Sequence, residues 1–106
     1  MRILLDESVP GRHGSYLTGH STITVQRRGW ASIKNGTLSG LAAGEFDVLL
    51  TADKGMEYQQ NLTTLPISIL TVLAPSNRLD DLAAAVPVIL SALAELPPRT
   101  LRKVAA

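Results

Sequence analysis

The sequence predicts an α/β domain whose mostly parallel sheet is covered by helices on both faces, as in a three-layer sandwich. Apolar, strand-like segments alternate along the chain with more polar, helix-like segments, and the connections between them are short. The segment ISILTVL, residues 67–73, is predominantly apolar, as expected of a strand covered on both sides. The length of 106 residues, 45% of them hydrophobic, suits one core. We therefore expect a single domain over residues 1–106, with the strand order 2-1-3-4-5.

The N-terminal third of the chain contains two predicted strands and one weakly marked helix. Arg2 to Leu5 is a short apolar run that predicts the first strand. A helix is expected over residues 9–18, because Pro10 suits a first helical turn, although two glycines lower the helix propensity. The β-branched residues of 22–25 predict the second strand. The polar segment 26–36 that follows is expected to be a loop.

The remaining elements continue the alternation. A short helix is expected over residues 37–43, and the apolar segment 46–51 predicts the third strand. A polar helix over residues 54–61 then leads to the fourth strand at 67–73.

The last part of the chain has the strongest helical pattern. It covers residues 79–95, where Pro87 is expected to kink the helix or to mark a restart. The apolar run within it either covers the sheet or forms a dimer face. Residues 100–106 suit an edge strand.

Composition excludes several functional classes. A formal net charge of +1 gives no overall field for wrapping DNA or binding a membrane surface, so any nucleic-acid contact must be local. The absence of cysteine excludes a disulfide framework, a zinc knuckle and a thiol nucleophile. The N-terminus does not resemble a signal peptide, and no apolar stretch reaches the roughly 18 residues of a membrane span. A cytoplasmic protein without a membrane partner is therefore expected.

Two acidic residues follow predicted strands that would be neighbours in the sheet. Asp6 follows the first strand and Asp53 follows the third. In an open parallel sheet of this order, ligands bind beyond the carboxyl ends of the strands, between the first and the third. Two close carboxylates repel each other unless a cation or a shared proton intervenes, and their oxygens suit Mg²⁺ or Mn²⁺. Such an ion activates water and stabilises charge on a phosphate, which is nuclease chemistry.

Four motifs, in this order, resemble the small bacterial PIN-like proteins, relatives of the PIN-domain ribonucleases that include the VapC-type toxins. They are LLDESVP, KNGTLSGLA, VLLTADKG and LAPSNR. The resemblance implies a metal-dependent ribonuclease whose acidic site includes Asp6 and Asp53, with Glu7 beside the first and Lys54 beside the second. It also implies a cognate antitoxin as partner.

One position departs from the family pattern. The family often has an acidic residue near the start of the central helix, and the matching residue here is Asn35. An asparagine amide oxygen can coordinate a metal but brings no charge, so a lower metal affinity is expected. The candidate catalytic residues are accordingly Asp6, Asp53, Glu7 and Asn35, with the first two as metal ligands.

Each acidic residue also has a purely structural interpretation. For Asp53, capping of the helix expected over 54–61 is an equally good explanation, since an aspartate before a helix accepts backbone N–H bonds. Ser8 is the expected cap before Pro10, which favours a site role for Asp6. Glu7 either points to solvent or lies beside the site. Asp80 and Asp81 begin a helix, and the helix dipole explains them sufficiently.

Basic residues near the expected crevice are candidates for binding RNA. Basic groups beside an exposed aromatic ring can hold a single-stranded backbone and stack a base. A solvated loop with Trp30 packed onto the core explains the same residues. The candidates are Arg27, Arg28, Lys34, Lys54 and Arg78.

Three functional classes remain open. A PIN-like ribonuclease, the toxin of a toxin–antitoxin pair, is favoured. A catalytically reduced module that binds an antitoxin or a second copy of itself is the alternative, and Asn35 favours it. A phosphoacceptor receiver domain, with Lys103 as its lysine, agrees less well with the sequence because almost no chain follows to form a last helix.

Overall fold

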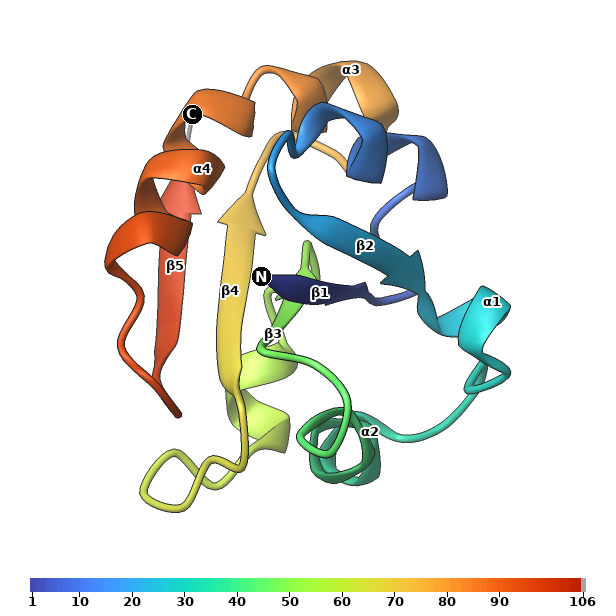
Figure 1. The fold of residues 1–106 in the computed structure, drawn as a ribbon, viewed down its shortest axis with the longest axis vertical. Helices are drawn as coiled ribbons and strands as arrows, with labels where there is room; N and C mark the ends of the chain where they lie inside the picture. Colours follow the sequence, from blue (N-terminus) through green and yellow to red (C-terminus); the bar gives the residue numbers. More distant parts are fainter. Residues whose placement is uncertain (106) are drawn as a thin grey trace.

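One parallel sheet of five strands organises the chain, in the order β2-β1-β3-β4-β5 (Figure 1). All four strand pairings are parallel. The structure is a computed structural model that describes residues 1–105, so the last position of the expected edge strand lies outside the described residues. The strands are β1 (Arg2–Leu5), β2 (Ser21–Thr24), β3 (Val48–Thr51), β4 (Ser68–Leu73) and β5 (Leu101–Ala105). The predicted fold class and strand order are confirmed.

The helical segments differ more from the expectations. They are η1 (Gly11–Tyr16), α1 (Val25–Arg28), α2 (Asn35–Ala42), η2 (Met56–Gln59), α3 (Leu79–Ala83) and α4 (Val86–Glu95). The α-helices expected over 9–18 and 54–61 are instead the short 3₁₀ segments η1 and η2. At Gly14 a Cβ atom would collide with the Thr22 side chain, so this glycine lets η1 lie close to β2.

The predicted loop over 26–36 contains one helical turn, α1. The Thr24 side chain accepts a hydrogen bond from the Arg27 N–H at 3.1 Å and caps this turn. Gly29 then ends it in the left-handed conformation, with φ of 85°. Gly29 lies within the predicted loop but Thr24 lies within the predicted second strand, and a turn this short has no apolar periodicity that would reveal it.

Pro87 marks a restart between two helices. Proline suits the first turn of a helix and cannot continue an earlier one, and it lies at the start of α4, after α3 has ended. The apolar face of α4 covers the sheet, with Ile89 and Leu93 fully buried. Among residues 1–105, no helix has the length and apolar character needed to cross a membrane.

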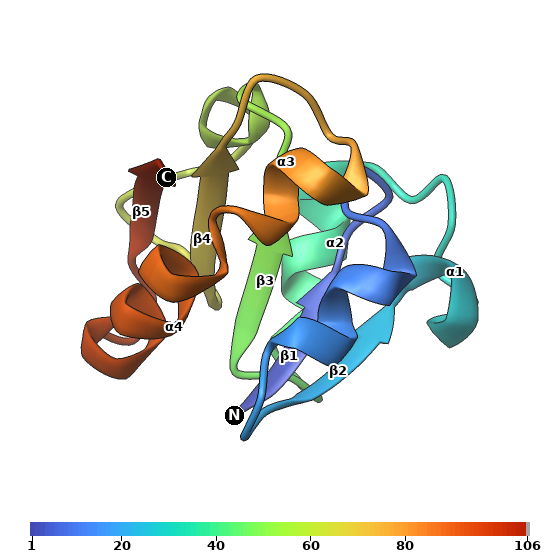
Figure 2. The same ribbon diagram turned by 90° about the horizontal axis from the view of Figure 1, so that it is seen from above.

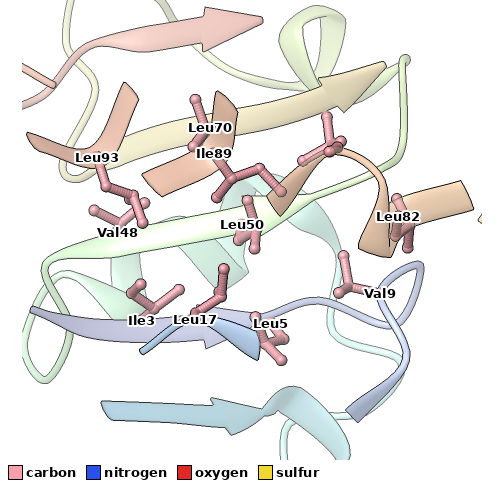
Figure 3. Close-up of a cluster of buried hydrophobic side chains, with 12 residues drawn as sticks. Ile3, Leu5, Val9, Leu17, Val48, Leu50, Leu70, Leu82, Ile89 and Leu93 are labelled. Atoms are coloured by element: carbon pink, nitrogen blue, oxygen red, sulfur yellow. The ribbon is translucent and has the colours of Figure 1, made fainter. Parts of the chain in front are cut away.

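Alternating strand residues face two separate hydrophobic clusters. Ile3, Leu5 and Leu50 face the cluster closed by η1, α3 and α4 (Figures 2 and 3). Leu4 and Leu49 face the opposite cluster, which α2 and η2 cover. Helical segments therefore cover both faces of the sheet, as in a three-layer sandwich.

The strand register brings the carboxyl ends of the central strands together. Leu5 lies opposite both Thr24 of β2 and Leu50 of β3, and Thr51 lies opposite Thr71 of β4. The residues that directly follow β1 and β3 therefore emerge side by side at one edge of the sheet.

Candidate functional site

Asp6 directly follows β1 and is buried at the edge of the sheet. Its N–H donates to the Leu50 carbonyl at 3.1 Å, and the residue is only 5% exposed. Its side chain accepts hydrogen bonds from three donors: the Ser8 N–H at 3.0 Å, the Ser8 hydroxyl and the Thr51 hydroxyl. Local hydroxyl and amide groups therefore solvate this carboxylate in place of water.

Ser8 is not the helix cap that the sequence suggested. Pro10 occupies the cap position of η1 and makes no side-chain cap hydrogen bond. The Ser8 hydroxyl instead donates to Asp6 and accepts from the Ala52 N–H at 2.9 Å. Ser8 thus ties the loop after β1 to the loop after β3, because its hydroxyl lies between the ends of two adjacent strands.

Thr51 makes the matching connection from β3. Its hydroxyl donates to Asp6 and accepts from the Asp53 N–H at 3.0 Å. We name Ser8 and Thr51 the hydroxyl pair. Neither residue was predicted to belong to the site, although each lies within two positions of one of the two aspartates.

Asp53 forms a tight turn. Its Oδ1 accepts from the Gly55 N–H at 2.8 Å, and among residues 1–105 no hydrogen bond reaches its Oδ2. The helix that it was expected to cap is absent, and η2 begins only at Met56. One carboxylate oxygen thus has a local structural role while the other retains its capacity to accept.

The predicted catalytic residues line one cavity of about 570 Å³. This acid cavity lies at the carboxyl ends of the strands, and the segments around α1 and α2 close it. It is lined by Asp6, Glu7, Ser8, Val25, Trp30, Ser32, Ile33, Asn35, Leu38, Ala52, Asp53 and Asn77. The fold therefore brings Asp6, Glu7, Asn35 and Asp53 together.

The environment of Asp6 opposes its negative charge. Burial is the main cause that raises the pKa of Asp6, and the nearby charge of Asp53 raises it further. Hydrogen bonds from Ser8 and Thr51 oppose this effect only in part. Within residues 1–105 the ion pairs are Arg28–Glu45 and Lys103–Glu57, so no basic side chain neutralises either aspartate.

Glu7 binds the loop before α2. Its Oε1 accepts a hydrogen bond from the Ser32 N–H at 2.5 Å. Ser32 has a φ of 68°, an unusual conformation for a residue other than glycine. Glu7 therefore fastens this loop at the cavity.

Asn35 contacts the segment after Asp53. Its side-chain amide donates to Gln59, and its carbonyl accepts from the Gln60 amide at 3.0 Å. Asn35 thereby links the start of α2 to η2. Its side chain lines the acid cavity, but its N–H groups contribute to packing between these two elements.

The basic candidates lie outside the lining of the acid cavity. Arg28 forms an ion pair with Glu45 at 2.7 Å and stacks on the Trp30 ring, 4.3 Å from its centroid. Glu45 precedes β3, so this ion pair links the segment after β2 to the segment before β3. Among residues 1–105 no ion pair holds the other candidates, Arg27, Lys34, Lys54 and Arg78.

Trp30 packs onto the core while also lining the cavity. Its ring meets the Phe46 ring edge-on at 6.2 Å, and it is half-buried against the cluster that contains Leu38. Most of the Trp30 surface is therefore packed against the core, as the alternative interpretation expected.

The other acidic and basic candidates have local partners. Asp81 accepts from the Ser76 hydroxyl at 2.5 Å at the start of α3. Lys103 pairs with Glu57 at 2.9 Å and does not line the acid cavity. The lysine that a receiver-type site requires is thus engaged elsewhere.

The donor set of the acid cavity suits a hard cation better than a soft one. Among the described residues, no three His, Cys, Asp or Glu side chains gather as metal ligands. Mg²⁺ nevertheless binds through one or two carboxylates, keeps several waters and is completed by substrate phosphates. Two aspartates and an asparagine amide fit that pattern. Family models, curated proteins and solved structures yield no match to the chain.

Proposed function

We propose that this chain is a metal-dependent ribonuclease and the toxin of a toxin–antitoxin pair. One observation carries the proposal: Asp6 and Asp53 share a cavity at the expected ligand site of the sheet, and within residues 1–105 neither has a basic partner. Burying an uncompensated carboxylate is unfavourable. A bound cation would remove this unfavourable charge balance.

The proposed cofactor is Mg²⁺ or Mn²⁺. Asp6 and Asp53 would hold the ion through their carboxylate oxygens, and the Asn35 amide oxygen is a third candidate ligand. When bound, the ion would supply activation of water and neutralisation of charge on the scissile phosphate.

The protein's own groups contribute orientation. Ser8 and Thr51 donate to different oxygens of Asp6, so the carboxylate is held in one orientation before any ligand arrives. Glu7 fixes the loop that bears Ser32. A site held in this way requires little rearrangement on binding.

RNA is the proposed substrate, and the cytoplasm is the proposed site of action. Lys34 and Arg78 are exposed and lie near the acid cavity in sequence, next to its lining residues Asn35 and Asn77. Exposed cations bind a phosphate backbone without reading its sequence. Lys54 and Arg27 are proposed to contribute in the same way, whereas Arg28 is already engaged by Glu45.

A catalytically reduced interaction module is the second candidate. Asn35 favours it, since this residue carries no charge and its N–H groups bind Gln59. Such a module would keep the fold and bind an antitoxin or a second copy of the chain without cleaving RNA.

Cleavage of labelled single-stranded RNA distinguishes the two candidates. The unmodified chain should cleave with Mg²⁺ or Mn²⁺ and should stop when EDTA is added. Asp6→Asn and Asp53→Asn should each lower the rate by at least about a hundredfold, which is typical when a charge-stabilising group is lost.

Asp80→Asn is the matched control, because Asp80 is exposed and lies outside the acid cavity. Its rate should equal that of the unmodified chain. Absence of cleavage by the folded, unmodified chain with either metal would favour the interaction module instead.

A further inference from the structure

The outer edge of β5 presents unpaired backbone groups. Within residues 1–105, β5 pairs only with β4 and forms the border of the sheet (Figure 1). The Ile69 N–H donates to the Thr100 carbonyl at 3.0 Å, so the backbone of Thr100 faces β4. Because these groups alternate along a strand, those of Leu101 and Lys103 point away from β4. They are positioned to pair with a further strand.

A partly apolar groove lies beside these groups. It has a volume of about 330 Å³, and its apolar lining comprises Leu62, Leu65 and Leu101. Leu62 is 51% exposed, so its apolar surface is accessible to a ligand in this groove. An added strand could place alternate apolar side chains in this groove while its backbone pairs with β5.

The same region carries an excess of positive charge. Arg99, Arg102 and Lys103 are all exposed. Glu57 neutralises Lys103 at 2.9 Å, whereas no ion pair within residues 1–105 holds the two arginines. A ligand with negative charge is therefore favoured.

We propose that this edge binds an extended acidic segment of another protein, which joins the sheet beside β5. Main-chain bonds to Leu101 and Lys103 would give affinity, and the groove and the two arginines would select an acidic, partly apolar sequence. A second copy of this chain fits poorly, because pairing two β5 edges brings like charges together. This inference does not depend on the proposed ribonuclease activity.

Binding of a designed peptide tests the proposal. The probe is a fluorescein-labelled peptide of alternating glutamate and valine, and the control is the same peptide with lysine in place of glutamate. Fluorescence anisotropy should show binding of the acidic peptide alone, weaker at high salt because the charges are exposed. If neither peptide binds, or both bind equally, the proposal is overturned and the basic residues only protect the edge from aggregation.

Two substitutions at Lys103 separate charge from backbone pairing. Lys103→Gln removes the charge and should weaken binding severalfold. Lys103→Pro also removes an outward N–H while leaving the bonds to β4 in place, and it should weaken binding by about a further tenfold. Arg12→Gln, at an exposed position of η1, is the control and should leave binding unchanged.

Amide hydrogen exchange in the unmodified chain provides a test that needs no variant. The acidic peptide should slow exchange at Leu101 and Lys103. Unchanged exchange at these amides with the peptide bound would contradict pairing at this edge. Sedimentation provides a second test. If the unmodified chain were a dimer and Lys103→Pro a monomer, a second copy of the chain would occupy the edge, and the proposal would be contradicted.

Discussion

Carboxylates in two regions of this molecule are stabilised in different ways. At the surface, Glu45 pairs with Arg28 and Glu57 pairs with Lys103. In the acid cavity, Asp6 has hydroxyl and amide donors but no basic partner among residues 1–105. The surface arrangement is ordinary electrostatic compensation. The cavity arrangement keeps a charge buried at a cost to stability, which is expected of a site that binds a cation.

Loss of the hydroxyl pair should produce the largest change in stability. Thr51→Val keeps the side-chain shape and removes a donor from the buried Asp6 carboxylate. Hydrogen bonds to charged groups contribute about 1.5–3 kcal/mol, so we expect a loss of about 2 kcal/mol in the free energy of unfolding at pH 7. Urea denaturation measures this loss, and Ser8→Ala should behave similarly.

The same substitution in an Asp6→Asn background provides the control. Without the charge, Thr51→Val should cost clearly less, which a double-mutant cycle quantifies. An equal loss in both backgrounds would show that Thr51 acts through packing alone.

Neutralising the buried acid should stabilise the fold. The folded-state pKa of Asp6 is raised above its unfolded value, so ionisation stabilises the unfolded state and stability falls as pH rises through this range. Asp6→Asn should therefore be more stable than the unmodified chain at pH 7, and the difference should shrink towards pH 4. Thermal melts across this pH range measure the difference, with Asp80→Asn as the control. A lower melting temperature for Asp6→Asn than for the unmodified chain at pH 7 would contradict this expectation.

His13 should give an opposite dependence on pH. It is fully buried, and its Nε2 lies 2.9 Å from the Leu82 carbonyl, while no partner among the described residues reaches Nδ1. Burial lowers the pKa of His13, so protons bind the unfolded state more readily and stability should fall as pH drops below about 6.5. His13→Gln should flatten this dependence in chemical denaturation, while His20→Gln should alter it less. Identical slopes for all three proteins would exclude His13 as the cause.

Breaking the surface ion pair should have the smallest effect. Arg28 and Glu45 are 38% and 36% exposed at their side chains, and pairs of this kind contribute about 0.2–1 kcal/mol. Glu45→Gln should therefore lower the unfolding free energy by about 0.5 kcal/mol, and less at high salt. A loss as large as that of Thr51→Val would remove the contrast between the two regions.

The elements that sequence predicted well are those whose signal is local. The strands were recognised because burial on both faces leaves a predominantly apolar pattern, as in β4. The strand order then placed Asp6 and Asp53 at one edge, and both line the acid cavity. The lengths of the two 3₁₀ segments were overestimated, because helical propensity says little about where a short helical segment ends.

The supporting contacts could not be predicted because they depend on neighbours distant in sequence. Ser8 lies two positions before Pro10, as a helix cap would. Its hydroxyl instead accepts a hydrogen bond from the N–H of Ala52, which directly follows β3. Arg28 lies in a basic run that suggests RNA binding, yet Glu45 holds it. In both cases the deciding partner belongs to another element of the fold.

Metal-dependent thermal stability tests the central claim most directly. If Asp6 and Asp53 hold a cation together, Mg²⁺ or Mn²⁺ should raise the melting temperature of the unmodified chain and of Asp80→Asn, because a ligand that binds only the folded state stabilises it. The metal should leave Asp6→Asn and Asp53→Asn unchanged. Equal shifts in all four proteins, or no shift in the unmodified chain, would contradict a cation site at these two aspartates.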